Sequence, residues 1–129
     1  MRSGDRHDAR GVTLSELLVV LAIISTLLTL AMPRYFSSLQ KSKEAVMKEN
    51  LWVMRDALDK YYGDAGKYPD RLEDLAIKKY LRAIPIDPIT GNSTSWHVIP
   101  PADPEKGGVY DVKSGADGNS TAGSPYSEW

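Results

Sequence analysis

Two groups near the N-terminus can form an ion pair within an apolar segment. Glu16 is the one charged residue between Val12 and Met32. An unpaired carboxylate costs about 2.5 kcal/mol or more at the centre of a bilayer, so Glu16 needs a cationic partner. A cut between Gly11 and Val12 would create an amine on Val12, about one helical turn from Glu16. In a stacked assembly, we expect Glu16 of one copy to pair with the Val12 amine of its neighbour.

The apolar segment itself, residues 12–32, has the length of a membrane span. As a helix its 21 residues cover about 31 Å, which matches a hydrocarbon core of about 30 Å. An ordinary secretory signal is cut after its apolar region, whereas here a polar leader comes first. A buried core helix is less consistent, because so small a domain cannot cover this much apolar surface. An uncleaved signal anchor would explain the apolar run but not the spacing of Gly11 and Glu16.

The run from Gly11 to Ile24 resembles the class III leader and first helix of type IV pilins and type II secretion pseudopilins. In that family a prepilin peptidase cuts after the glycine and methylates the new amine, and the glutamate directs assembly. The resemblance therefore implies cleavage after Gly11, methylation of Val12 and an assembly role for Glu16. Pro33 falls where the family has a helix-bending proline. One departure is Val12, because phenylalanine is usual there; cleavage is expected to tolerate this, whereas the efficiency of methylation stays open.

Charge and composition agree with a small exported domain on a stalk. The chain has 16 basic and 17 acidic residues, and the leader holds three of the former and two of the latter, so the remainder carries a net charge of −2. This balance does not suggest a nucleic-acid surface. The leader arginines favour a cytoplasmic N-terminus, although basic residues also follow the apolar segment. The absence of cysteine excludes a disulfide in the exported domain, whereas many type IV pilins have one, and this favours the pseudopilins.

Beyond Pro33 the helix is expected to continue as an amphipathic helix over residues 34–66. A proline inside a helix removes one hydrogen bond, so a bend or local melting is expected at Pro33. Gly63 and Gly66 are expected to end the helix. An apolar stripe with helical spacing predicts the face that packs on the globular domain; it consists of Met47, Leu51, Met54, Leu58 and Tyr61. Charged residues, Glu44 among them, are expected on the other faces.

Residues 67–129 are expected to form a small globular domain from short elements. Asp70 is predicted to cap a short helix through Leu75, with Glu73 as its capping-box partner. Two strands are predicted, over residues 95–99 and 109–112, and the motif at 87–91 predicts a turn. The expected core contributors are Leu72, Leu75, Ile77, Tyr80, Leu81 and Ile84. Because two short strands are marginal alone, they should lie on the long helix, which gives an α+β pilin fold with a small antiparallel sheet.

A second block, residues 86–96 and 109–118 with the tail 123–129, resembles the major, G-class pseudopilin of type II secretion. In that group the loop after the sheet binds calcium. The resemblance implies a side-chain ligand from Asp117 and backbone carbonyl ligands from Ser114 and Asn119. Calcium takes six to eight oxygen ligands, and the family's second acid is missing near residues 123–124. Asp111 or Glu128 is a possible substitute, and a solvated turn without metal is the open alternative.

The sequence contains no constellation that predicts catalysis. His7 lies in the leader, so His97 is the one histidine of the mature chain, and cysteine is absent. Zinc sites and Cys–His nucleophiles are therefore excluded. His97 is expected to be a surface or half-buried strand residue, and no phosphate-binding glycine motif or nucleophile elbow is present. We therefore expect a structural subunit and not an enzyme.

Together these features predict four parts: a leader (1–11), a transmembrane and assembly helix (12–33), its amphipathic continuation (34–66) and a globular domain (67–129). The chain is expected in the inner membrane, with a cytoplasmic N-terminus and a periplasmic domain, and then in a periplasmic filament. The resemblance implies these partners: further copies of the chain in a helical homopolymer, minor pseudopilins, the prepilin peptidase and the inner-membrane assembly platform. Two alternatives stay open, namely a type IV or DNA-uptake pilin and a membrane-anchored binding module that does not polymerise.

Overall fold

The computed structural model describes residues 13–129. The chain divides into two units, Met1–Ser38 and Leu39–Trp129, and helix α2 (Leu14–Ala65) contributes to both. Gly11 and Val12, the predicted cleavage and methylation positions, lie outside the described residues.

The C-terminal end of α2 depends on a glycine. The helix ends at Ala65, and Gly66 follows with a φ of +73°, a conformation that glycine adopts without steric cost. The backbone N–H of Gly66 donates to the carbonyl of Tyr62 at 2.8 Å. The predicted stop at Gly66 is therefore confirmed, whereas Gly63 lies inside the helix and does not end it.

Pro33 lies within α2, and the helix continues through it. The local melting expected there is therefore not present in the single chain. A proline still leaves the carbonyl one turn earlier without its usual backbone donor, so the bend expected at Pro33 stays a prediction.

The core of the second unit forms around the apolar stripe of α2. Met47, Leu51, Met54 and Leu58 are each at most 2% exposed, and Tyr61 packs against their cluster as a half-buried residue. The other buried members of the cluster come from α2 and from later segments; they are Ala57, Leu72, Leu75, Trp96, Val109 and Val112. The spacing of the stripe thus correctly predicted the buried face of the helix.

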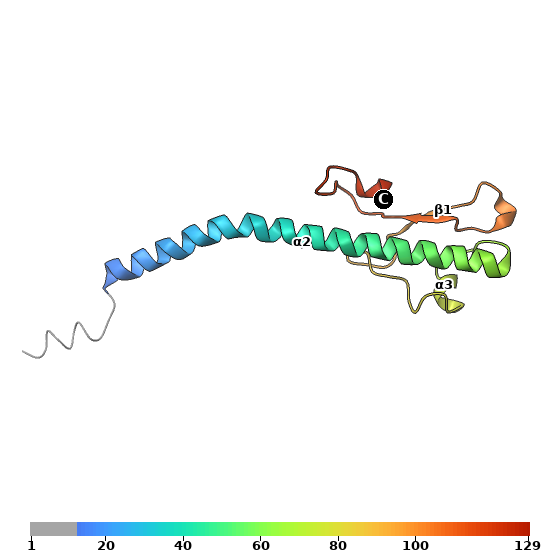
Figure 1. The fold of residues 1–129 in the computed structure, drawn as a ribbon, viewed down its shortest axis with the longest axis horizontal. Helices are drawn as coiled ribbons and strands as arrows, with labels where there is room; N and C mark the ends of the chain where they lie inside the picture. The colour runs from blue at the N-terminus through green and yellow to red at the C-terminus, as the bar shows by residue number, and fades with distance from the viewer. Residues whose placement is uncertain (1–12) are drawn as a thin grey trace, which may run out of the picture. The chain divides into compact units, whose positions relative to one another are not determined.

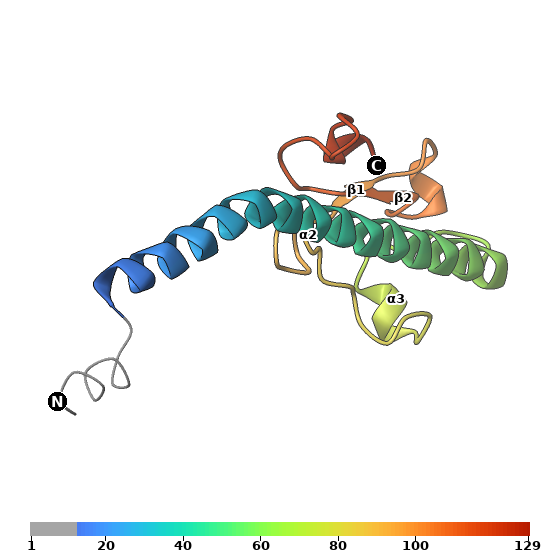
Figure 2. The ribbon, with the colours of Figure 1, turned by 60° about the vertical axis from the view of Figure 1, so that its left-hand side comes forward.

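The sheet has two antiparallel strands, β1 (His97–Ile99) and β2 (Asp111–Lys113), with Val98 opposite Val112. Both predicted strands are confirmed, with small shifts of their ends. The 3-10 helix η1 (Pro104–Lys106) lies in the connection between them. In Figures 1 and 2 the sheet lies along one side of the C-terminal part of α2, and helix α3 (Asp74–Ile77) lies on another. This α+β arrangement agrees with the expected pilin fold.

The local prediction around α3 is wrong in two respects. The helix begins at Asp74, its N-cap is Glu73 without a side-chain cap bond, and Asp70 does not cap it. Instead the Asp74 carboxylate accepts the backbone N–H of Arg71 at 3.2 Å. Ile77 is 63% exposed and does not join the core, whereas Leu72 and Leu75 are buried. A single-turn helix has no repeating face, which is why the expected assignments failed there.

The turn at Asp87 is confirmed, and its carboxylate holds it. Oδ1 of Asp87 accepts the backbone N–H groups of Ile89 at 2.8 Å and Thr90 at 3.3 Å. The N–H of Gly91 donates to the Asp87 carbonyl at 2.7 Å. Asp87 is fully buried, so these hydrogen bonds replace the water that its carboxylate loses.

Candidate functional site

The N-terminus of α2 presents Glu16 on a capped helix. The hydroxyl oxygen of Thr13 accepts the backbone N–H of Glu16 at 3.2 Å, and the Thr13 carbonyl accepts the N–H of Leu17 at 3.1 Å. This is the N-cap geometry of a Thr-x-x-Glu motif, and the spacing of Thr13 and Glu16 in the sequence is the signal that could have predicted it. Within residues 13–129 the Glu16 carboxylate has no ion-pair partner, and its side chain is exposed. The acid is therefore available to a cation from elsewhere.

The helix that follows Glu16 has the properties of a membrane span. In the part of the chain that the structure describes, α2 is the one helix long and apolar enough to cross a membrane. Its apolar segment is not buried against the rest of the chain. Its threonine hydroxyls are satisfied within the helix: Thr26 donates to the Ala22 carbonyl and Thr29 to the Ser25 carbonyl, both at 2.8 Å. Such bonds remove the cost of placing hydroxyl groups in hydrocarbon.

The predicted calcium ligands lie in the C-terminal loop, which we define as residues 114–126. Asp117 and Asn119 are exposed, whereas Ser114 is fully buried and donates its hydroxyl to Oδ2 of Asp87 at 3.1 Å. Asp117 is the one acid in the loop. No group of three acidic or histidine side chains suited to a metal occurs in residues 13–129.

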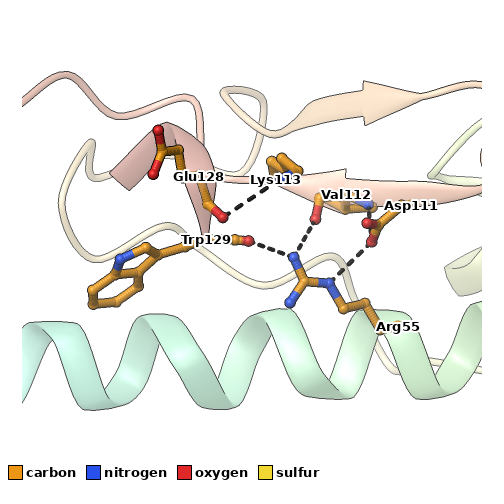
Figure 3. A network of polar contacts seen from close by, with 6 residues as sticks. All are labelled: Arg55, Asp111, Val112, Lys113, Glu128 and Trp129. Carbon is orange, nitrogen blue, oxygen red and sulfur yellow. Dashed lines mark hydrogen bonds and ion pairs between the residues drawn. The ribbon is translucent and has the colours of Figure 1, made fainter. Parts of the chain in front are cut away.

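The two substitute acids differ in how far their side chains are engaged. Asp111 is already engaged by Arg55, and the bond of Glu128 in Figure 3 uses its backbone carbonyl. The described residues thus supply far fewer charged oxygens than a closed calcium site uses. The calcium site stays a prediction.

An arginine of α2 joins the sheet and the C-terminal segment (Figure 3). Nε of Arg55 donates to Oδ1 of Asp111 at 3.0 Å, and Nη2 donates to the carbonyl oxygens of Val112 at 2.9 Å and Trp129 at 2.5 Å. Nearby, Nζ of Lys113 donates to the carbonyl of Glu128 at 3.4 Å. The planar guanidinium group can serve three acceptors at once, which a lysine ammonium cannot do with the same geometry.

A second polar contact involves a residue for which the sequence-based expectation is wrong. Glu44 is expected on a solvated face of the helix, but its side chain is only 7% exposed. Its carboxylate accepts the backbone N–H and the hydroxyl of Thr121, at 2.7 and 2.8 Å, and the phenol of Tyr126 at 2.9 Å. The spacing of Glu44 could have predicted its burial. Glu44 precedes Met47 by three residues, so it lies on the same face of the helix as the apolar stripe.

The electrostatics of Glu44 follow from these contacts. Burial alone would raise the pKa of Glu44, but the hydrogen bonds from Thr121 and Tyr126, together with the charge of Lys48, lower the pKa below its ordinary value of 4.5. Burial raises the pKa of Tyr126; the bond from Gln40 lowers it, and the bond to Glu44 and the charge of Glu44 raise it further. Glu44 is therefore an anion at neutral pH, and Tyr126 is its neutral donor.

Two further polar residues of the described chain are His97 and Asp56. His97 is an exposed residue of β1, as predicted. Asp56, an acid of α2, forms an ion pair with Lys60 at 2.9 Å. Neither residue lies beside a nucleophile in a described contact, so both are consistent with a structural role.

Comparisons with known proteins agree with these features. The model of the prokaryotic N-terminal methylation motif matches residues 6–32. The type II secretion system core protein G of Pseudomonas aeruginosa is 31% identical over 88% of this chain and 87% of its own length. The protein of the same name from Escherichia coli K12 is 28% identical over 100% of this chain and 95% of its own length.

A pilin relative covers less of the chain. The type IV major pilin protein PilA of Myxococcus xanthus is 32% identical over 51% of this chain, but over only 30% of its own length. No solved structure matches. The similarity to the secretion proteins thus covers most of the chain, whereas the similarity to the pilin covers about half of it.

Proposed function

The chain belongs to the family of the type II secretion system core protein G, and we propose that it is the structural subunit of a periplasmic pseudopilus that drives protein export. We propose that prepilin peptidase cuts it after Gly11, that Val12 is methylated and that copies of the chain then stack helix on helix. Its role is structural and not enzymatic, so the energy for assembly must come from another protein.

The observation that carries this proposal is the exposed acid on an exposed apolar helix. The side chains of residues 14–32 are exposed in the single chain, and the Glu16 carboxylate has no ion-pair partner among residues 13–129. Such a surface is unstable in water and fits a bilayer or the centre of a helical filament. A Val12 amine from a neighbouring copy would neutralise Glu16 there, and this pairing would guide each addition.

The same features support a location. We propose that the chain is first anchored in the inner membrane by residues 12–33, with its N-terminus in the cytoplasm and residues 39–129 in the periplasm. Minor pseudopilins and an inner-membrane assembly platform are the partners that this role requires. A type IV or DNA-uptake pilin is the second candidate, supported by the PilA similarity over half of the chain.

Replacing Glu16 by alanine tests the assembly mechanism. We expect Glu16→Ala to be cut normally and to remain in the membrane, yet to yield far fewer filaments, because the incoming subunit lacks its charge partner. The matched control is Glu49→Ala, which removes an exposed acid elsewhere on α2. Unchanged filament yield in Glu16→Ala would contradict the ion-pair mechanism. Full biological function of this variant in cells that form no filament would favour the anchored binding module.

Deleting the gene tests whether the chain acts in protein secretion or in a pilus. Restoring a wild-type copy is the control. Loss of specific exported proteins with surface pili intact would support the secretion role. Loss of pili, motility or DNA uptake with secretion intact would support the pilin alternative. Survival of both would favour the anchored binding module, provided that no paralogue in the strain covers for the deleted gene.

A further inference from the structure

The Glu44 carboxylate lies between the helix and the C-terminal loop. Its oxygens accept three donors from two points of the loop, Thr121 and Tyr126. The bond from the backbone N–H of Thr121, at 2.7 Å, is short, as expected for an ionised acceptor. The two hydroxyl bonds, at 2.8 and 2.9 Å, have ordinary lengths. A buried carboxylate oxygen without a hydrogen-bond donor would destabilise the folded chain. The loop donors therefore stabilise the buried carboxylate, and the carboxylate in turn holds the loop in place.

The loop is also closed by its own backbone. The N–H of Ser120 donates to the Ser124 carbonyl at 2.7 Å, and the N–H of Tyr126 donates to the Gly118 carbonyl at 3.2 Å. Gln40, one turn before Glu44 on α2, donates to the Tyr126 phenol. Tyr126 is buried and stacks edge-on against Trp129, with ring centroids 5.2 Å apart. The loop between Gly118 and Tyr126 is thus held by bonds within the chain.

The charge at the centre of these contacts has the opposite sign to that of a calcium ion. A calcium ion orders a loop by attracting carbonyl and carboxylate oxygens toward a positive charge. Here a negative charge orders the loop by attracting N–H and O–H donors. The loop's one acid, Asp117, is exposed and takes no part in this contact.

We infer that the buried carboxylate of Glu44 holds the C-terminal loop on helix α2, so that in this chain the loop is ordered without a bound metal ion. The inference concerns the single chain and does not depend on the proposed function. It departs from the calcium-ordered loop that the resemblance implies.

The test uses the full chain in detergent micelles. Its Tm is measured by circular dichroism in millimolar calcium and in excess chelator. Amide hydrogen exchange of residues 118–126 is measured under both conditions. We expect the same Tm and the same protection with and without calcium. A Tm several degrees lower in chelator, with the loss of protection confined to the loop, would overturn the inference.

Variants separate the carboxylate from the calcium prediction. Glu44→Gln retains the size of the side chain but replaces one acceptor by an amide donor that faces other donors. We expect it to lower the Tm by about 10 °C and to expose the loop amides in both solutions. Asp117→Asn is the matched control, because it removes the exposed acid, and it should change neither measurement. Unchanged loop protection in Glu44→Gln, or a calcium effect abolished by Asp117→Asn, would overturn the inference.

Two less disruptive variants test the same inference if Glu44→Gln fails to fold. Tyr126→Phe removes the phenol donor but keeps the ring, and Thr121→Val removes the hydroxyl donor but keeps the N–H. Each should increase exchange within residues 118–126 while leaving β1 and β2 protected. Equal exchange in wild type and both variants would contradict the inference.

Discussion

Arg55 and Asp111 form an ion pair across 56 residues of chain, with Nε and Oδ1 3.0 Å apart. The pair joins helix α2 to the first residue of β2. Its side chains are 39% and 29% exposed, so solvent weakens the charge attraction itself. The further bonds of Arg55 to the Val112 and Trp129 carbonyls make it a structural link rather than a surface pair.

Removing this link should destabilise the domain. We expect Arg55→Ala to lower the free energy of unfolding by about 1–3 kcal/mol, because three acceptors lose their charged hydrogen-bond donor. The measurement is chemical unfolding of the full chain in detergent, followed by tryptophan fluorescence. Lys60→Ala is the control, since it breaks the more exposed pair with Asp56 (67% and 37% exposed) and should cost about 0.5 kcal/mol or less. Equal effects of the two variants would contradict the proposed link.

Gly115 is required for a close approach of two backbone segments. A Cβ added there would lie 1.8 Å from the Ser95 carbonyl oxygen, whereas a Cβ at Gly63, inside α2, would meet nothing within 4 Å. We expect Gly115→Ala to destabilise the domain by at least about 1–3 kcal/mol, since backbone must shift. Gly63→Ala should stabilise it by about 0.5–1 kcal/mol, as expected for alanine in a helix interior. Thermal melting of both variants checks the opposite signs.

The buried Glu44 predicts an acid-sensitive domain. Its folded pKa lies below the ordinary value of 4.5, so folding favours the charged form. The resulting stability is fully present well above pH 4.5 and is lost as the pH falls through the folded pKa. The titratable groups that face Glu44 are Lys48 on α2, whose charge helps to lower the pKa of Glu44, and Tyr126 on the loop side, whose own pKa is raised.

A series of melting temperatures from pH 7 downward tests this dependence. Glu44→Gln should be less stable at neutral pH and should show a shallower decline in acid than wild type. Glu49→Gln, which alters an exposed acid of the same helix, should leave the wild-type slope unchanged. Parallel curves for wild type and Glu44→Gln would exclude Glu44 as the source of the acid sensitivity.

Processing at Gly11 can be checked by mass spectrometry of membrane extracts. We expect the mature chain to begin at Val12 and to carry one added methyl group on its amine. A bulky residue at Gly11 should leave the leader attached and prevent filament formation, because the Val12 amine would then be absent. Cleavage at another position would contradict the proposed pairing between Val12 and Glu16.

Features that depend on a local pattern of residues could be predicted from the amino-acid sequence. Three such features are the lone acid of the apolar run, the buried stripe from Met47 to Leu58 and the turn at Asp87. Each depends on residues within a few positions of one another. Helical spacing and hydropathy report such features directly, because one turn of helix or one tight turn contains the whole pattern. The family resemblance added the expected chemistry of Gly11 and Val12.

Tertiary structure alone decided what Glu44 and Ser114 do. From its neighbours in the sequence, Glu44 is one of many charged residues on an amphipathic helix. Ser114 is, by the same evidence, a loop residue with a free hydroxyl. Their partners, Thr121 and Asp87, lie 77 and 27 residues away, so no local spacing predicts these bonds. The chain buries an acid only where the fold delivers enough donors to replace water, and that condition is met only after distant segments have packed together.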